Sequence, residues 1–167
     1  MVTIDNLDQG RGAVARSILA TLPEWFGRPA SLDAYVRAAD DLEMLVARTP
    51  GGTCVGFLSL KAHTAAAVEA YVLGVDRARH REGIGRALFD HAAKCLAGRG
   101  YRFLTVKTLA ASHPDPHYAA TRRFYEAIGF EPLEVFPTLW DSDTPCLLMV
   151  RSLAGGGSTG AWRHVEA

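Results

Sequence analysis

The stretch VLGVDRARHREGIGRALF, residues 72–89, passes from an apolar strand pattern through a charged loop into a helix pattern. Gly83 and Gly85 lie where the loop enters the helix, at the point where backbone N–H groups lack intrahelical partners and the helix dipole is positive. Glycine also lets a ligand approach the backbone closely. The stretch therefore favours a phosphate-binding site. The alternative, which a Gly-x-Gly pattern alone leaves open, is that Gly83 and Gly85 only help the helix to begin and bind no ligand.

Two common phosphate-binding signatures do not fit this loop. A dinucleotide fingerprint would need a third glycine at position 88, which is Leu88, and the chain has no GxxxxGK[ST] motif. If the loop binds a phosphate, that phosphate belongs to another class of ligand, and the rest of the chain has to indicate which.

The composition limits the kind of protein this is. With 167 residues, the chain has the length of one domain, and Lys plus Arg equal Asp plus Glu at 18 each. A neutral chain argues against nucleic acid as a partner. The sequence holds no apolar run of about 18 residues and no signal-peptide core, so we expect no membrane association. Three widely spaced cysteines, Cys54, Cys95 and Cys146, favour free thiols in a reducing, cytoplasmic compartment.

Periodicity and turn residues predict the order of the elements. We expect one domain over residues 1–153, followed by a flexible Gly-rich tail at 154–167 that carries Trp162. The predicted helices are 10–22, 31–40, 83–100 and 117–130, and the predicted strands are 42–48, 53–61, 65–76, 101–109, 132–140 and 146–153.

Two motifs in this order suggest a family. His80-Arg81-Glu82-Gly83-Ile84-Gly85 resembles the (Gln/Arg)-x-x-Gly-x-(Gly/Ala) loop of the GCN5-related N-acetyltransferase family, and residues 124–130, FYEAIGF, resemble its FYxxxGF motif. The resemblance covers about residues 42–153. It implies an α/β (α+β) fold with a central mixed, mostly antiparallel twisted sheet of about six to seven strands, flanked by about four helices.

The resemblance also implies acetyl-CoA as the co-substrate and assigns residues to it. The loop amides would hold the pyrophosphate, and the strand backbone around Leu73 and Val75 would bind the pantetheine arm and polarise the thioester carbonyl. His80 stands where the family has Gln or Arg, which we expect to change the details of the site without abolishing it. The residues this implies for the phosphates are His80, Arg81, Gly83, Ile84, Gly85 and Arg86.

Acetyl transfer to an amine also needs an acid and a base. An alkylamine with a pKa near 10.4 is mostly protonated at pH 7, and Glu69 is the candidate to remove that proton. The alternative for Glu69 is an ion pair with a neighbouring arginine, or exposure to solvent. By resemblance, the Tyr125 phenol protonates the departing thiolate, and the alternative for Tyr125 is a packing role on its helix.

The acceptor side is less defined. Trp25 and Phe26 fall in the region that, by resemblance, lines the acceptor pocket, with core packing as the alternative. In SHPDPHY, residues 112–118, the side chains of His113, Asp115 and His117 alternate with prolines. We expect no metal there, because no fourth ligand is evident and the chemistry needs none. The loop then either recognises the acceptor or caps the following helix.

These inferences predict an acetyl-CoA-dependent N-acetyltransferase that acts on a primary amine of a small molecule by direct attack on the thioester. Acetylation of a protein or peptide amine, and binding of acyl-CoA by a sensor without turnover, are the alternatives. The sequence is compatible with a monomer or a homodimer.

Overall fold

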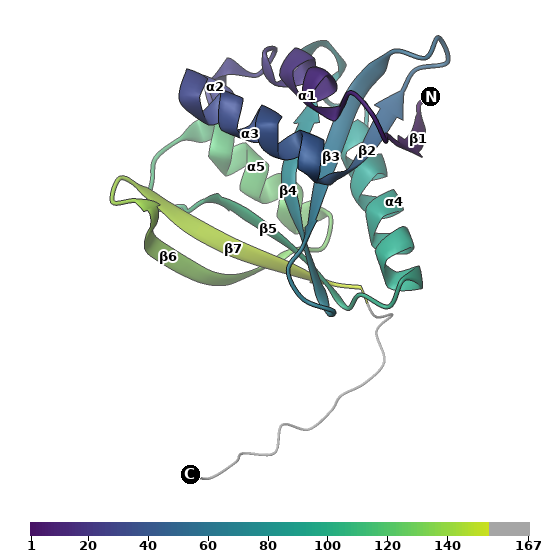
Figure 1. Cartoon of the computed structure of the whole chain (residues 1–167). Coiled ribbons are helices and arrows are strands. Elements are labelled where there is room, and N and C mark those ends of the chain that lie inside the picture. Colours follow the sequence, from purple (N-terminus) through teal and green to yellow (C-terminus); the bar gives the residue numbers. More distant parts are fainter. Residues whose placement is uncertain (154–167) are drawn as a thin grey trace.

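The computed structural model describes residues 1–153, so the predicted tail at 154–167, with Trp162, lies outside the described residues. Figure 1 shows how the elements are arranged. In chain order they are β1 (Thr3–Asn6), α1 (Arg11–Leu19), α2 (Pro23–Phe26), α3 (Pro29–Asp41), β2 (Glu43–Arg48), β3 (Cys54–Ala62), β4 (Ala67–Val75), the 3₁₀ turn η1 (Arg77–Arg79), α4 (Ile84–Gly98), β5 (Phe103–Leu109), α5 (Pro116–Ala127), β6 (Glu131–Asp141) and β7 (Thr144–Ser152).

The strands form one seven-stranded sheet in the order β1-β2-β3-β4-β5-β7-β6. The pairing of β4 with β5 is parallel and every other pairing is antiparallel. A parallel pair needs a long crossover, which α4 provides between these two strands. The predicted mixed, mostly antiparallel sheet is therefore confirmed.

The N-terminal region differs from the prediction. The segment 10–22, predicted as one helix, ends at Leu19, and Pro23 begins the separate helix α2. The second helix begins at Pro29, before the predicted Ser31. Proline is tolerated in the first turn of a helix but not inside it, so both prolines start helices and the count rises to five. Strand β1 was missed because it is a short edge strand that is mostly exposed and carries no apolar pattern.

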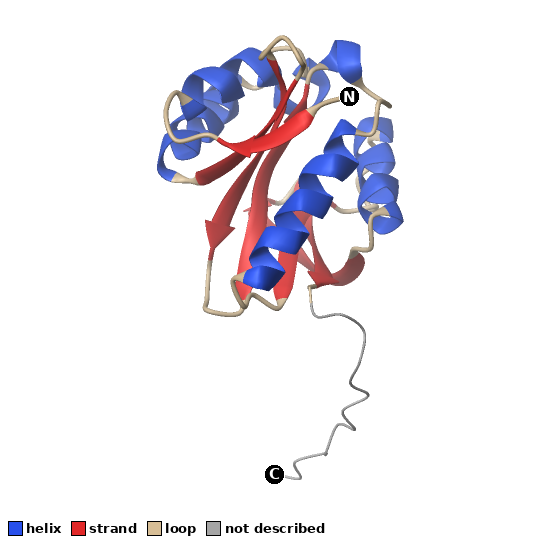
Figure 2. Cartoon of the chain, turned by 90° about the vertical axis from the view of Figure 1, so that its right-hand side faces the viewer, coloured by secondary structure: helices blue, strands red, loops and turns tan. Residues whose placement is uncertain are grey.

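Helices cover both faces of the sheet, as Figure 2 shows. On one face, α1 and α3 bury Ile18, Leu19 and Val36 against Phe57 of β3. On the other face, α4 and α5 pack on the strands, and their buried residues belong to one cluster that includes Ile84, Leu88, Phe89, Ala92, Leu96, Tyr125, Leu58, Leu104 and Val106. The sheet is thus buried on both sides over its centre.

A β-bulge in β4 positions the functional region. Val72 pairs with Ser59 and Ala70 pairs with Leu60, so Tyr71 is an extra residue on β4. The bulge shifts which alternate residues point to each face of the sheet. The ladder between β4 and β5 consists of three pairs, from Ala67 with Phe103 to Glu69 with Thr105. Past Glu69 the two strands are no longer in register, so the sheet opens toward their carboxyl ends.

Candidate active site

A cavity of about 970 Å³ lies where β4 and β5 separate. The carboxyl-terminal part of β4, the loop into α4, and α5 form one end, and α2, α3 and the end of β6 form the other. Every site residue predicted from the sequence lines this cavity except His113 and Asp115. The lining residues among them are Trp25, Phe26, Glu69, Leu73, Val75, His80, Arg81, Gly83, Ile84, Gly85, Arg86, His117 and Tyr125.

The loop before α4 has the backbone geometry of an anion site. Gly83 is the N-cap of α4, a helix of 15 residues, and has φ 78°. Arg81 also has a positive φ, 66°, which is uncommon for a bulky residue and costs about 1–3 kcal/mol. A Cβ added at Gly83 would meet no atom within 4 Å, and Gly83, Ile84 and Gly85 all line the cavity. The residues present therefore fit a phosphate group.

Four basic side chains surround this loop. The His80 Nε2 lies 2.9 Å from the backbone oxygen of Val75, so the ring is turned back toward the end of β4. Arg79 donates to Glu82 at 2.9 Å, and Arg86 donates to the Ala127 carbonyl at 3.1 Å. Arg81 is exposed at the cavity mouth. The electrostatic field at this end of the cavity therefore favours an anion.

Gly85 has a packing role that the sequence did not indicate. A Cβ at this position would lie 3.1 Å from Cζ of Phe124 and 3.9 Å from Cδ2 of Leu73. The missing side chain therefore lets the start of α4 approach α5 and β4 closely. Gly83 gives the left-handed turn and Gly85 gives the close contact, so the two glycines of the motif serve different needs.

Tyr125 lies at the base of the cavity and is buried, at 8% exposure. Its ring centroid is 5.9 Å from that of Phe89, 5.6 Å from Phe124 and 5.7 Å from Phe130. Burial, with a smaller effect from the Tyr118 phenol, raises the pKa of Tyr125 well above its ordinary value. The phenol is therefore protonated at neutral pH and rigidly held by three aromatic rings.

Glu69 lines the cavity and is 3% exposed. Lys107 Nζ lies 2.9 Å from its Oε2, and His63 Nε2 lies 2.5 Å from the same oxygen. Lys107 comes from β5 and is 38 residues away in the sequence. The sequence left an ion pair with an arginine as an alternative; Glu69 does have ionic contacts, but its partners are Lys107 and His63, and both use Oε2.

The loop 112–118 does not gather its three polar side chains. Asp115 is the N-cap of α5, and its Oδ1 accepts from the amides of His117 at 2.8 Å and Tyr118 at 3.2 Å. The helix-capping alternative is the one the structure shows. The Nδ1 of His113 is buried without a hydrogen-bond partner in residues 1–153. Within that range, no group of three His, Cys, Asp or Glu side chains is arranged to hold a metal ion.

His117 and Trp25 meet at the cavity wall. Their ring centroids are 5.1 Å apart, and Trp25 Nε1 donates to Thr121 Oγ1 at 3.1 Å. These contacts join α2 to α5 and close one side of the cavity. Trp25 is thus part of the wall, in the region where acceptor contacts were expected.

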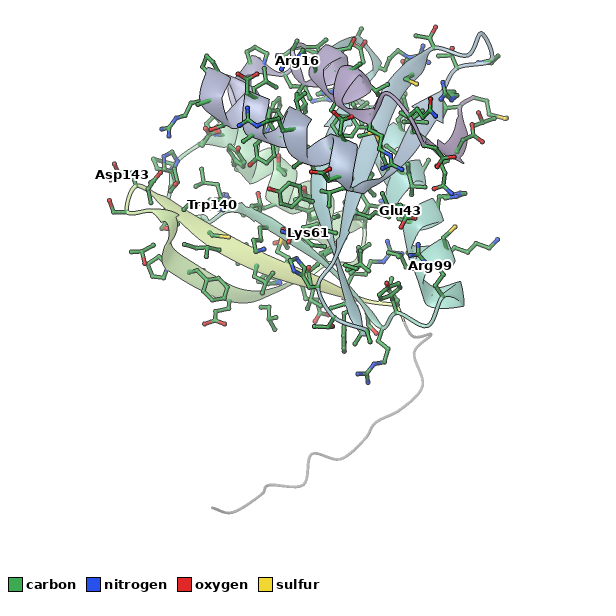
Figure 3. All side chains as sticks on the ribbon, viewed as in Figure 1. Arg16, Glu43, Lys61, Arg99, Trp140 and Asp143 are labelled. Carbon is green, nitrogen blue, oxygen red and sulfur yellow. The ribbon has the colours of Figure 1, made fainter. Side chains whose placement is uncertain are left out.

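Several aromatic lining residues were not found from the sequence. Tyr35 of α3, Tyr71 at the bulge, Tyr118 of α5 and Trp140 of β6 all contribute to the cavity. Figure 3 labels Trp140 close to the β6–β7 hairpin. Single aromatic residues in four separate elements have no shared sequence pattern. Only Tyr118, which lies in the SHPDPHY stretch, had a signal nearby.

Comparison with known proteins identifies the family. Residues 40–132 match the family model described as an acetyltransferase (GNAT) domain. This range contains the α4 loop, Glu69 and Tyr125. The chain belongs to the GCN5-related N-acetyltransferase family. The family is one of acyltransferases, and the fold is that of a GNAT domain.

One curated relative is similar in part. A mycothiol acetyltransferase of Beutenbergia cavernae is 36% identical over 84 residues, which are 50% of this chain and 26% of that protein. The chain thus matches only about a quarter of that relative's length.

Three solved structures share the fold at low identity. A putative acetyltransferase of the GNAT family from Desulfovibrio desulfuricans has a TM-score of 0.80 at 20% identity and covers 92% of this chain and 100% of that chain. An aminoglycoside 6'-N-acetyltransferase complexed with coenzyme A has a TM-score of 0.70 at 19% identity, covering 93% and 99%. The ribosomal-protein-S18-alanine N-acetyltransferase from Escherichia coli has a TM-score of 0.73 at 20% identity, covering 97% and 100%.

In residues 1–153, no helix combines the length and the apolar character that crossing a membrane requires.

Proposed function

We propose that this enzyme transfers the acetyl group of acetyl-CoA to a primary amine of a small molecule, by direct attack of the amine on the thioester. The observation that carries this proposal is one continuous cavity that joins an anion-binding loop to a buried phenol and a buried carboxylate. An anion site, an acid and a base are the groups that this transfer needs.

The loop residues would hold the co-substrate by its phosphates. The residues at the start of α4 line the cavity together with Arg79, Arg81 and His80, so free amides of the first helical turn and basic side chains lie near one another. The backbone of β4 past the bulge, at Leu73 and Val75, is not paired with β5, so its polar groups are available to the pantetheine arm, except the Val75 carbonyl, which His80 contacts. Acetyl-CoA supplies the activated acyl group as a thioester. The family membership and the coenzyme A bound to a protein of the same fold support this assignment.

Glu69 would take the proton from the incoming amine. Presenting the amine in its neutral form at pH 7 costs about 4–5 kcal/mol, which a carboxylate base offsets. Lys107 and His63 both contact Oε2, which leaves Oε1 for the amine. Nitrogen then bonds to the acyl carbon, the proton passes to Glu69, and the carbon–sulfur bond breaks.

Tyr125 would protonate the departing thiolate. Its raised pKa keeps the phenol neutral over the range in which the enzyme works, so the proton is present when the thiolate forms. The phenol is regenerated from solvent or from the proton released by the amine, so the sum of the reaction is an amide and a free thiol.

The cavity shape supports a small acceptor. The Trp25–Thr121 hydrogen bond and the Trp25–His117 ring contact wall off one side. An extended peptide needs an open groove on both sides of the reacting amine, whereas a small molecule does not.

We place the reaction in the cytoplasm, because Cys54, Cys95 and Cys146 are all free thiols.

The decisive experiment follows thiol release from acetyl-CoA with a panel of amines, together with calorimetric binding of acetyl-CoA. We expect binding, and thiol release that depends on a small primary amine. Acetyl-CoA binding without release across a broad panel would favour the sensor alternative. Faster release with a peptide N-terminus than with any small amine would favour the protein-acetylating alternative.

A further inference from the structure

The cavity has two chemically different ends. The end at the α4 loop is lined by basic side chains and backbone amides, as described above. The other end is lined by aromatic side chains from five elements around one carboxylate. These side chains are Phe26 of α2, Tyr35 of α3, Tyr71 of β4, Tyr118 of α5 and Trp140 of β6. Trp25 of α2 lies between the two ends, with its ring centroid 6.3 Å from that of His80.

The aromatic side chains at this end form a connected wall. The Phe26 and Tyr35 rings meet edge to face with centroids 5.5 Å apart and an interplanar angle of 88°. Tyr35 meets Tyr71 at 6.0 Å and 65°. The contacts run from α2 through α3 to the bulge in β4, so each ring is held in place by its neighbours. None of these three side chains is fully buried, and each lines the cavity.

The charge at this end is small. Glu69 is the one carboxylate among the residues that line the cavity in the described part of the chain. Its charge is already matched by Lys107 at 2.9 Å. Lys61, which does not line the cavity, lies with its Nζ 5.4 Å from the centroid of the Tyr71 ring.

This balance of charge selects against polycations. A molecule with several ammonium groups would place them beside Lys107, which lines the cavity, and a single carboxylate that Lys107 and His63 already contact. Ammonium groups that leave water without a counter-charge are strongly disfavoured. An acceptor with one amine has one charge to lose, and the chemistry itself removes that charge.

We propose that the acceptor is an arylalkylamine: one primary amine on a short alkyl chain that ends in an aromatic ring. This inference rests on the proposed function and specifies the acceptor of the same site. The ring packs among Phe26, Tyr35 and Tyr71, because aromatic rings prefer edge-to-face and offset contacts with one another. The short chain then brings the amine from this wall to the Oε1 of Glu69.

The experiment compares kcat/KM for four amines at saturating acetyl-CoA: 2-phenylethylamine, propylamine, spermidine and kanamycin. Propylamine has one ammonium group and no ring, and the last two are polycations. We expect 2-phenylethylamine to exceed each of the others by at least about tenfold. A higher kcat/KM for spermidine or kanamycin would overturn the inference.

Variants locate the effect at the wall. In Tyr71→Leu and Tyr35→Leu, the ratio of kcat/KM for 2-phenylethylamine to that for propylamine should fall about tenfold, while acetyl-CoA affinity confirms that each variant is folded. Tyr101→Leu is the matched control, because Tyr101 is a partly buried tyrosine that does not line the cavity, and it should keep the ratio of the unchanged enzyme. An unchanged ratio in both wall variants would overturn the inference.

The outcomes separate this inference from the proposed function. Failure to bind acetyl-CoA would overturn the proposed function itself. Acetyl-CoA binding with no turnover of 2-phenylethylamine, or with preferred turnover of a peptide, would overturn the arylalkylamine inference alone.

Discussion

Replacing Tyr125 with Phe tests the acid directly, because it removes one oxygen atom and keeps the ring. The ring packs against Phe89, Phe124 and Phe130 at centroid distances of 5.6–5.9 Å, and phenylalanine retains those contacts. We therefore expect the free energy of unfolding to change by less than about 1 kcal/mol. We also expect acetyl-CoA affinity to be unchanged.

The activity should fall far more than the stability. A positioned general acid contributes about 10²–10⁴-fold to a rate. A thiolate is a weaker base than an alkoxide or an amide nitrogen, so the lower limit applies. We expect kcat to fall about 100-fold, which is about 2.7 kcal/mol in activation free energy. Since the phenol acts only as the carbon–sulfur bond breaks, kcat and kcat/KM should fall together.

The assay measures free thiol continuously, with acetyl-CoA affinity from calorimetry and stability from urea unfolding. Tyr101→Phe is the control, because it makes the same change at a tyrosine outside the cavity lining. A Tyr125→Phe enzyme with kcat within about threefold of the unchanged enzyme would refute the acid role and leave Tyr125 as a packing residue. A loss of acetyl-CoA affinity equal to the loss in kcat would point to binding as the cause.

Three further results are expected. Glu69→Gln should lower kcat about 100-fold without weakening acetyl-CoA binding. The control Glu43→Gln, which changes an exposed ion pair with Arg99, should keep the kcat of the unchanged enzyme. Equal kcat values in the two variants would argue against Glu69 as the base. Asp115→Ala removes the cap of α5 and should cost about 1 kcal/mol in unfolding free energy, lowering Tm by about 2–4 °C; an unchanged Tm would show that the cap adds nothing. Burial raises the pKa of Tyr118 to about 12, above its unfolded value near 10, so this neutral phenol contributes stability that is complete below pH 10 and is lost as pH rises through 12. Urea unfolding of Tyr118→Phe should therefore show a smaller loss of stability from pH 9 to 12 than the unchanged enzyme, and equal losses would contradict the shift.

Much of the scaffold could be predicted from local sequence patterns. The strand–loop–helix of residues 72–89 and the FYEAIGF stretch have the predicted types, with boundaries that differ by a few residues. The Asp115 cap followed the same logic, because a capping side chain bonds to amides two and three residues ahead. Errors concentrated at the N-terminus, where Pro23 and Pro29 divide the segment into more helices than the apolar spacing indicated.

The local order of the residues determined the types of most elements and the loop before α4, because turns, caps and apolar periodicity depend on neighbours within a few positions. The family and the candidate acid and base came from the resemblance of two short motifs to those of the family. Only the tertiary structure decided the acceptor end of the cavity. The ladder between β4 and β5 ends at Glu69, just before the bulge at Tyr71, and the aromatic side chains that line the cavity come from elements far apart in the chain. Glu69 likewise receives Lys107 from 38 residues away. Side-chain contacts between distant elements depend on how strands pair and helices pack, and no local pattern records them.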